Sequence, residues 1–193
     1  MVIEFMNYIK MIIFCSIMNF KFIEKIDVTN IKSKLKDLDW DSFDWRIKNS
    51  QGSHSETKSV PIIFDENRKE PIKQENYILF SDTLNDIKNI FQKTYGDGIL
   101  FTALLINLPA GKRIKSHIDV GENFDLSHRV HIPIITNDRC FFSVDEEIKN
   151  MKEGEMWEID NNGKYHWVSN EGETDRIHLL VDWKATKKEK TII

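Results

Sequence analysis

The stretch RVHIPIITNDRCFFSV, residues 129–144, contains two short apolar runs on either side of the polar sequence TNDR. Val, Ile and Phe are favoured in strands, whereas Asn and Asp are favoured in tight turns. Both runs are shorter than an ordinary helix, and both are bounded by turn residues. The stretch therefore predicts two consecutive β-strands.

Similar runs lie on both sides of this stretch. Between residues 99 and 183 the chain also contains ILFTALLINL, EMWEID, YHWVS and RIHLLVDW, with turn sequences such as PAGK, KEGE, NNGK and NEGET near their ends. Six short strands at this spacing indicate a closed or double-sheet β architecture, such as a jelly roll. Upstream, we expect SVPIIF and NYILF to add edge strands.

Two helices are expected before the main series of strands. Residues 27–38 have apolar residues at helical spacing, with Thr29 as the expected N-cap. Residues 81–95 have an apolar face and stop at Gly96. Because the helices precede the strands, the chain is not an alternating βα protein. We expect a mainly β fold of the α+β type: a double-stranded β-helix, or cupin-like jelly roll, with N-terminal flanking helices.

Composition limits the class of protein. A chain of 193 residues with 40% hydrophobic and 30% charged residues suits one globular domain. The net charge of -4 argues against a dedicated nucleic-acid binder, and we expect no membrane partner. Two cysteines do not make a disulfide framework, so a reducing compartment, the cytoplasm, is expected.

The two ends of the chain differ from the middle. Residues 1–17 are apolar, but Glu4 and Lys10 interrupt them, and the longest clean run is too short to span a membrane. We expect a loose N-terminal extension there, with a signal or anchor as the alternative. We expect one jelly-roll domain over residues 18–184. The charged residues 185–193 are expected to form a fraying tail.

Polar residues recur at alternate positions of several expected strands. Residues two apart in a strand point to the same face, so each such pair projects together. Charges inside a barrel are costly unless they are paired or bind a ligand. The polar residues in question are His117 with Asp119, Arg129 with His131, Arg176 with His178, and the single His166 in YHWVS.

The types of these residues suit a metal and an anion. Two neutral imidazoles and one carboxylate on one side of Fe(II) leave adjacent coordination positions open. His117 and Asp119, at one strand end, and His166, on a distant strand, are the candidate ligands; the alternative is three unrelated polar residues near turns. Arg176 on the last strand is suited to a bidentate pair with a dicarboxylate.

Arg176 also has a structural alternative. It follows two acidic residues, Glu173 and Asp175, and an ion pair with either of them would account for its charge. His54, in the sequence GSHSETKSVPI, is expected to be an exposed loop histidine, with a place at the mouth of the substrate site as the alternative. Residues 40–60 and 120–128 are the segments in which we expect specificity loops.

From residue 108 to residue 183 the sequence resembles the aspartyl/asparaginyl β-hydroxylase family of Fe(II)/2-oxoglutarate-dependent oxygenases. The segments that carry the resemblance are LPAGKRIKSHID, HRVHIPI, KEGEMWEID and YHWVSNEGETDRIHLLVDW, and more weakly HSETKSVPIIF upstream. An HxD pair alone is weak evidence. Its combination with RxH on the next strand, a later histidine and a final arginine is far more specific.

The resemblance implies a cofactor set and a role for each residue. Fe(II), 2-oxoglutarate and O2 would be required. Asp119 is a departure from animal members that act on growth-factor-like domains, because these lack a carboxylate at that position. In this family the implied iron ligands are His117, Asp119 and His166, the implied partner of the distal 2-oxoglutarate carboxylate is Arg176, and the implied partners of the other carboxylate end are Arg129 and His131.

The sequence thus predicts a dioxygenase that hydroxylates an unactivated C–H bond of an amino acid or a peptidyl residue, with succinate and CO2 as co-products. The substrate partner stays open between a small amino acid and a peptide or protein. A cupin-like metal-binding module without oxygenase activity is the alternative function. Arg176 separates the two, since a dicarboxylate cosubstrate needs a cation and a simple metal cupin does not.

Overall fold

The computed structural model of the protein describes residues 18–119, 121 and 126–186. The expected N-terminal extension, most of the expected tail and part of the second expected specificity loop lie outside these residues. The limits of the single domain, 18–184, therefore stay a prediction. Among the helices of the described residues, none has the length and apolar character needed to cross a membrane.

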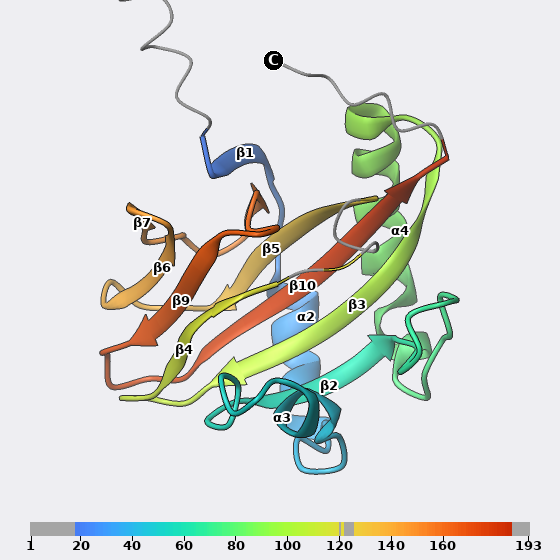
Figure 1. The fold of residues 1–193 in the computed structure, drawn as a ribbon. Coiled ribbons are helices and arrows are strands. Elements are labelled where there is room, and N and C mark those ends of the chain that lie inside the picture. The colour runs from blue at the N-terminus through green and yellow to red at the C-terminus, as the bar shows by residue number, and fades with distance from the viewer. Residues whose placement is uncertain (1–17, 120, 122–125, 187–193) are drawn as a thin grey trace, which may run out of the picture.

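Two antiparallel sheets form the body of the molecule (Figure 1). The larger sheet has the strand order β1 (Phe20–Lys25), β8 (Glu155–Ile159), β5 (Ser127–Ile135), β10 (Arg176–Ala185), β3 (Gly98–Leu108) and β2 (Lys58–Ile63). The smaller sheet has the order β4 (Arg113–Ile118), β9 (Tyr165–Asn170), β6 (Cys140–Val144) and β7 (Glu147–Lys149). This arrangement confirms the predicted mainly β jelly roll.

Strand β10 shows how the sequence separates the core from the site. Successive side chains of a strand point to opposite faces of the sheet. One face of β10 packs into the large apolar core through Ile177, Leu179, Val181 and Trp183. The other face points toward the smaller sheet and carries Arg176, His178, Leu180 and Asp182. Along β10, residues that pack in the apolar core therefore alternate with residues that face the space between the two sheets.

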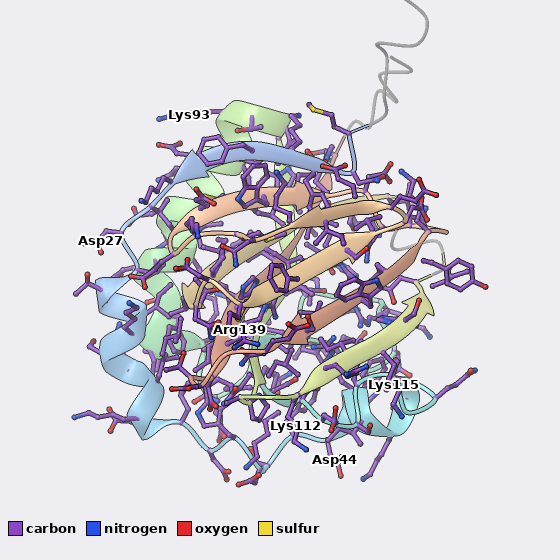
Figure 2. All side chains as sticks on the ribbon, turned by 90° about the vertical axis from the view of Figure 1, so that its left-hand side faces the viewer. Asp27, Asp44, Lys93, Lys112, Lys115 and Arg139 are labelled. Carbon is purple, nitrogen blue, oxygen red and sulfur yellow. The ribbon has the colours of Figure 1, made fainter. Side chains whose placement is uncertain are left out.

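Helix α4 (Tyr77–Tyr95) and the short helix α2 (Thr29–Lys34) cover the outer face of the larger sheet (Figures 1 and 2). The predicted helix over 81–95 is confirmed, but it begins four residues earlier, at Tyr77. The predicted edge strand NYILF is therefore wrong. Phe80 lies at helical spacing from Leu84, and both are buried, so helical packing on the sheet decides the structure of this segment. Gly96 ends the helix at φ 79°.

The first predicted helix is shorter than expected. Residues 29–34 are α-helical, and a 3₁₀ turn, η1 (Leu35–Asp37), follows. Thr29 is not the N-cap, because the capping position is Val28, whose side chain cannot cap. Asp27 takes this role instead: its carboxylate accepts hydrogen bonds from Thr29 N at 2.9 Å and from Thr29 Oγ1 at 2.6 Å.

The edges of the larger sheet are β1 and β2. The predicted edge strand SVPIIF is confirmed as β2, which pairs with β3 alone. Pro61 lies within β2, where its missing N–H costs least because one side of an edge strand has no ladder. Strand β1 was not predicted, since its pattern of mostly exposed residues, FKFIEK, lacks a clear alternation.

The packing of α4 on the sheet predicts unequal costs for two equal truncations in that helix. Ile87 is fully buried, whereas Ile78 is 75% exposed. Replacing Ile87 by Ala should lower the free energy of unfolding by about 2–5 kcal/mol, because a cavity is left in the core. Ile78→Ala, the matched control, should change it by less than about 0.5 kcal/mol. Urea unfolding of the metal-free protein measures both, and equal losses would contradict this packing.

Candidate active site

Pairing of β4 with β9 brings the first and last candidate ligands together. His117 on β4 lies directly opposite His166 on β9 in the antiparallel register. Asp119 follows β4, and its position is fixed by a bridge to Asn162 and by its carbonyl, which accepts from Gly163 N at 2.9 Å. Residues far apart in the sequence thus meet because β4 and β9 are neighbours in the smaller sheet (Figure 1).

The three predicted metal ligands converge on one point. One ligand atom from each of His117, Asp119 and His166 can be chosen so that all lie within 4.8 Å of one another. Nε2 of His117 is 3.8 Å from Oδ1 of Asp119, and Nε2 of His166 is 3.6 Å from Oδ2. The two imidazole rings are tilted, with their centroids 4.1 Å apart.

Backbone carbonyl groups set the orientation of both imidazoles. Nδ1 of His117 lies 2.7 Å from the carbonyl oxygen of Lys115, and Nδ1 of His166 lies 3.0 Å from that of Lys164. Since a carbonyl oxygen only accepts, each Nδ1 carries the proton and each Nε2 is free to act as a ligand. Burial lowers the pKa of His166, which favours the neutral imidazole that a metal requires.

The residues present fit a divalent metal ion. Nε2 of His117 is buried and, within the described residues, has no hydrogen-bond partner. Nδ2 of Asn161 lies 3.2 Å from both Asp119 Oδ2 and His166 Nε2. The amide can therefore donate a hydrogen bond to each of these atoms, but it donates none to His117. Three converging acceptors need a cation, and two imidazoles with one carboxylate suit non-haem Fe(II).

Arg129 joins the candidate metal ligand Asp119 to the larger sheet. Its Nε and Nη2 donate to the two carboxylate oxygens of Asp182 on β10 at 2.8 and 3.0 Å. Its Nη1 donates to Oδ2 of Asp119 at 2.8 Å. Burial would raise the pKa of Asp119, but Arg129 supplies the largest opposing effect, and the pKa is lowered overall. Asp119 is therefore held as a carboxylate.

Asp182 was not predicted as a site residue, although its position on the last strand indicates that role. It lies in phase with Arg176 and His178 on the last strand, two positions beyond Leu180. That phase places it on the inner face, where a buried carboxylate requires a cationic partner. Arg129 on the neighbouring strand is that partner.

Arg176 lies deep between the two sheets. It is 3% exposed, and its Nη2 lies 2.9 Å from Nδ1 of His178. Its guanidinium is 6.0 Å from the ring centre of Phe142. Burial lowers the pKa of Arg176 to about 10, and Cys140 acts in the opposite direction without offsetting the lost hydration. The arrangement leaves a buried cation that can accept an anionic ligand.

The alternative ion pair of Arg176 with its acidic neighbours does not form. Asp175 instead accepts hydrogen bonds from Asn107 Nδ2 at 3.0 Å and from Ala110 N at 3.3 Å. Over the described part of the chain, no carboxylate lies within ion-pair distance of Arg176. The charge of Arg176 is thus available to a ligand, because no ion pair within the described residues neutralises it.

Two further histidines line the same interior. His131 and His178 are buried, and burial, followed by the Arg176 charge, lowers both pKa values well below their usual range. Nδ1 of His131 has no hydrogen-bond partner among the described residues. A neutral histidine with an unused nitrogen can donate to or accept from a ligand in the cavity.

His54 is not the exposed loop residue expected from the sequence. It is 9% exposed, and its ring meets that of His117 edge to face, with centroids 4.7 Å apart. The reason is that Ser53 O accepts a hydrogen bond from Lys115 N at 3.1 Å, which draws the loop onto β4. Burial is also the main cause of the strongly lowered pKa of His54.

A cavity of about 750 Å³ leads from the surface to the candidate ligands. One wall comes from helix α3 (Trp45–Asn49) and the loop after it, within the segment 40–60 expected to set specificity. Residues of β4 also line this cavity, and Figure 2 shows Lys115 of this strand beside α3. A smaller inner cavity continues toward Arg176, His131 and His178. The two cavities share lining residues, among them His117, Asp119 and Arg129, so the predicted site residues surround adjoining spaces.

The sequence match agrees with this geometry. A model of the aspartyl/asparaginyl β-hydroxylase family matches residues 25–186, most of the chain. The chain belongs to the aspartyl/asparaginyl β-hydroxylase family. Membership makes the protein a 2-oxoglutarate-dependent hydroxylase, as the sequence predicted. No curated protein sequence matches this family member.

Solved structures share the fold of this β-hydroxylase family member. An oxidoreductase of the 2-oxoglutarate–Fe(II) oxygenase family from Burkholderia pseudomallei is 13% identical, with a TM-score of 0.66 over 86% of this chain and 84% of that one. The collagen prolyl hydroxylase of Paramecium bursaria Chlorella virus-1 is 9% identical, with a TM-score of 0.53 over 90% and 99%. A Pseudomonas putida prolyl-4-hydroxylase is 9% identical, with a TM-score of 0.51 over 88% and 94%. At these identities the likeness concerns the fold.

Ion pairs link Asp182 to Arg129 and Arg129 to Asp119. They predict that Asp182 strengthens the binding of Fe(II) by this β-hydroxylase family member. Asp182→Asn keeps the side-chain shape but removes the charge that balances Arg129. Arg129 should then draw more strongly on Asp119, and Fe(II) affinity should fall by about 10- to 100-fold. Anaerobic competition with a chromogenic chelator measures this affinity.

Asp138→Asn is the matched control, because the Asp138 side chain is 92% exposed and pairs with Lys152 on the surface. It should bind Fe(II) as the wild type does. A thermal melt of both variants verifies that they are folded. Wild-type affinity in a folded Asp182→Asn variant would contradict the positioning role of Asp182.

Proposed function

We propose that the protein hydroxylates an unactivated C–H bond of an amino acid or a peptidyl residue, using Fe(II), O2 and 2-oxoglutarate. The reaction would convert R–H, O2 and 2-oxoglutarate into R–OH, succinate and CO2. One observation carries the proposal: a convergent His–Asp–His set and a buried arginine, which has no carboxylate partner among the described residues, line the same inner cavity.

In this proposal His117, Asp119 and His166 hold Fe(II). The bound metal would supply the oxygen chemistry that no side chain can perform. The protein itself fixes the orientation of the three metal-binding side chains: backbone carbonyls orient the two imidazoles, and Arg129 orients the carboxylate. Preorganised ligands of this kind leave the remaining coordination positions open to the cosubstrate.

Arg176 is the proposed partner of the distal carboxylate of 2-oxoglutarate. Its planar guanidinium is suited to a bidentate pair, and its burial makes that pair strong. His131, with its unused Nδ1, is proposed to contact the other end of the cosubstrate near the metal. Arg129 is proposed to contribute there as well, although its pairs with Asp182 and Asp119 make the positioning of Asp119 its main task.

The outer cavity is the proposed place of the substrate. Its volume of about 750 Å³ accommodates an amino acid or a single side chain of a peptide. Trp45, Leu104 and Leu180 on its walls would exclude water from the reacting bond. The free thiol of the buried Cys140 supports the cytoplasm as the proposed compartment.

Titration of the cosubstrate tests the role of Arg176. Anaerobic protein is loaded with Fe(II) and titrated with 2-oxoglutarate, while the visible metal-to-ligand charge-transfer band is recorded. The wild type should develop the band. Arg176→Ala should need about 10- to 100-fold more 2-oxoglutarate, because a charged hydrogen-bonded partner of the carboxylate is lost.

Arg139→Ala is the control for this titration, because Arg139 is an exposed arginine in the turn before β6 (Figure 2). It should titrate as the wild type does. A wild-type protein that binds Fe(II) but shows no band would favour the cupin-like metal-binding module over the oxygenase. An unchanged titration in Arg176→Ala would instead move the cosubstrate away from this residue.

Removal of one proposed ligand should abolish turnover. Asp119→Ala and His166→Ala each remove one of the three ligand atoms that converge in this chain, and Asp119→Ala also leaves Arg129 beside the metal position without that carboxylate. Succinate release from 2-oxoglutarate should fall to the background of the metal-free protein. If either folded variant kept most of its activity, the assignment of that ligand would be wrong.

A further inference from the structure

A buried amide lies against two of the candidate metal ligands, Asp119 and His166. Asn161, in the turn between β8 and β9, is 3% exposed and lines the inner cavity. The turn fixes its backbone, because its carbonyl oxygen accepts a hydrogen bond from Lys164 N at 3.2 Å. The next residue, Asn162, forms a bridge with Asp119. The turn therefore presents the amide of Asn161 to the carboxylate.

The neighbours of the amide determine which of its two ends faces them. Nδ2 lies 3.2 Å from Oδ2 of Asp119 and 3.2 Å from Nε2 of His166. An ionised carboxylate only accepts hydrogen bonds. Nε2 of His166 also accepts, because Nδ1 of that ring donates to the carbonyl oxygen of Lys164. The NH2 end of Asn161, which carries two donors, must therefore face the site.

The two side chains that donate to Asp119 both meet the same oxygen atom. Nη1 of Arg129 donates to Oδ2 at 2.8 Å, and Nδ2 of Asn161 donates to Oδ2 at 3.2 Å. A carboxylate oxygen has about two lone-pair sites, so these bonds fill Oδ2. Oδ1 accepts from none of the described residues and lies 3.8 Å from Nε2 of His117. Asp119 thus offers one oxygen to a metal rather than both.

The number of oxygens that Asp119 gives to the metal decides how many coordination positions stay open. Two imidazoles and one carboxylate oxygen occupy three of the six positions of an octahedral metal. A keto acid that chelates the metal takes two more, and a single position is then left for O2. A carboxylate bound through both of its oxygens would occupy that last position. The hydrogen bonds to Oδ2 therefore bear on the entry of O2.

We propose that Asn161 holds Asp119 as a one-oxygen ligand and so keeps one coordination position of the metal open for O2. The inference rests on the proposed function and concerns the same metal site. Without Asn161, Arg129 would fill only one lone-pair site of Oδ2 and leave the other to the metal. A metal on Nε2 of His166 takes the second acceptor of the amide, and the bond to Asp119 remains. Asn161 is a positioning residue, because it acts through Asp119.

Counting the water molecules on a bound metal tests this role without turnover. Mn(II) is the probe, because its electron paramagnetic resonance signal is broadened by every bound water that carries the isotope oxygen-17. Metal-free protein is loaded with Mn(II) under anaerobic conditions in labelled water. The broadening is recorded before and after 2-oxoglutarate is added. It reports how many positions the protein and the keto acid leave open.

The wild type should keep a bound water after 2-oxoglutarate is added. Asn161→Ala should have one bound water fewer before the addition and none after it, because Oδ2 of Asp119 takes that position. Succinate release by the Fe(II) form of this variant should fall by about 10- to 100-fold, with an unchanged 2-oxoglutarate titration.

Two further variants complete the experiment. Asn161→Ser has a side chain too short to reach Oδ2, so it should give the same water counts, and it replaces Asn161→Ala if that variant does not fold. Asn85→Ala is the matched control, because Asn85 is exposed on α4. It should match the wild type in the water counts and in succinate release. Thermal melts of the metal-free proteins verify that each variant is folded.

Two outcomes would overturn the role of Asn161 alone. The first is the wild-type number of bound waters in a folded Asn161→Ala variant. The second is a folded variant that no longer binds Mn(II), since Asn161 would then retain the metal rather than set its open positions. A wild type that binds Mn(II) but loses no water to 2-oxoglutarate would refute the proposed function itself, and this result is visible before any variant is made.

Discussion

The partly buried carboxylate of Asp119 is the constraint on which the site depends. It faces two imidazole nitrogens that can only accept hydrogen bonds, so it cannot be neutralised by them. Its charge is balanced by Arg129 on the other sheet, and the second carboxylate, Asp182, balances the remaining charge of that arginine. A buried charge is tolerated only in such a network. The ion pairs therefore tie the two sheets together at the point where the chemistry is placed.

Strand β10 contributes to both the apolar core and the site. One face completes the apolar core beneath α4, and the other carries the charged and polar groups of the interior. A one-residue slip in its pairing would move Arg176 and Asp182 into the core and would bring Trp183 into the cavity. The register with β3 and β5 thus fixes stability and site together.

Much of this could be predicted from the sequence because strands alternate with a period of two. The runs in residues 99–183 gave the sheets, and the phase of their polar residues gave the candidate ligands and Arg176. NYILF was misjudged because a short apolar run fits a strand as well as a helix, and only the packing of Phe80 decides between them. His54 and Arg46 lie in a loop and a one-turn helix, where no periodicity shows which side chains turn inward.

The hydrogen bonds that orient the two candidate metal-binding histidines have a consequence for how such a site persists in evolution. Each acceptor is a main-chain oxygen two residues earlier, at Lys115 and Lys164. A main-chain oxygen is present whatever residue occupies the position, so mutation of either lysine leaves the hydrogen bond that orients the imidazole ring intact. The imidazoles therefore place no demand on the lysine side chains, and at Lys115, which lines the outer cavity, a lineage can remodel the rim for new molecules without disturbing its centre.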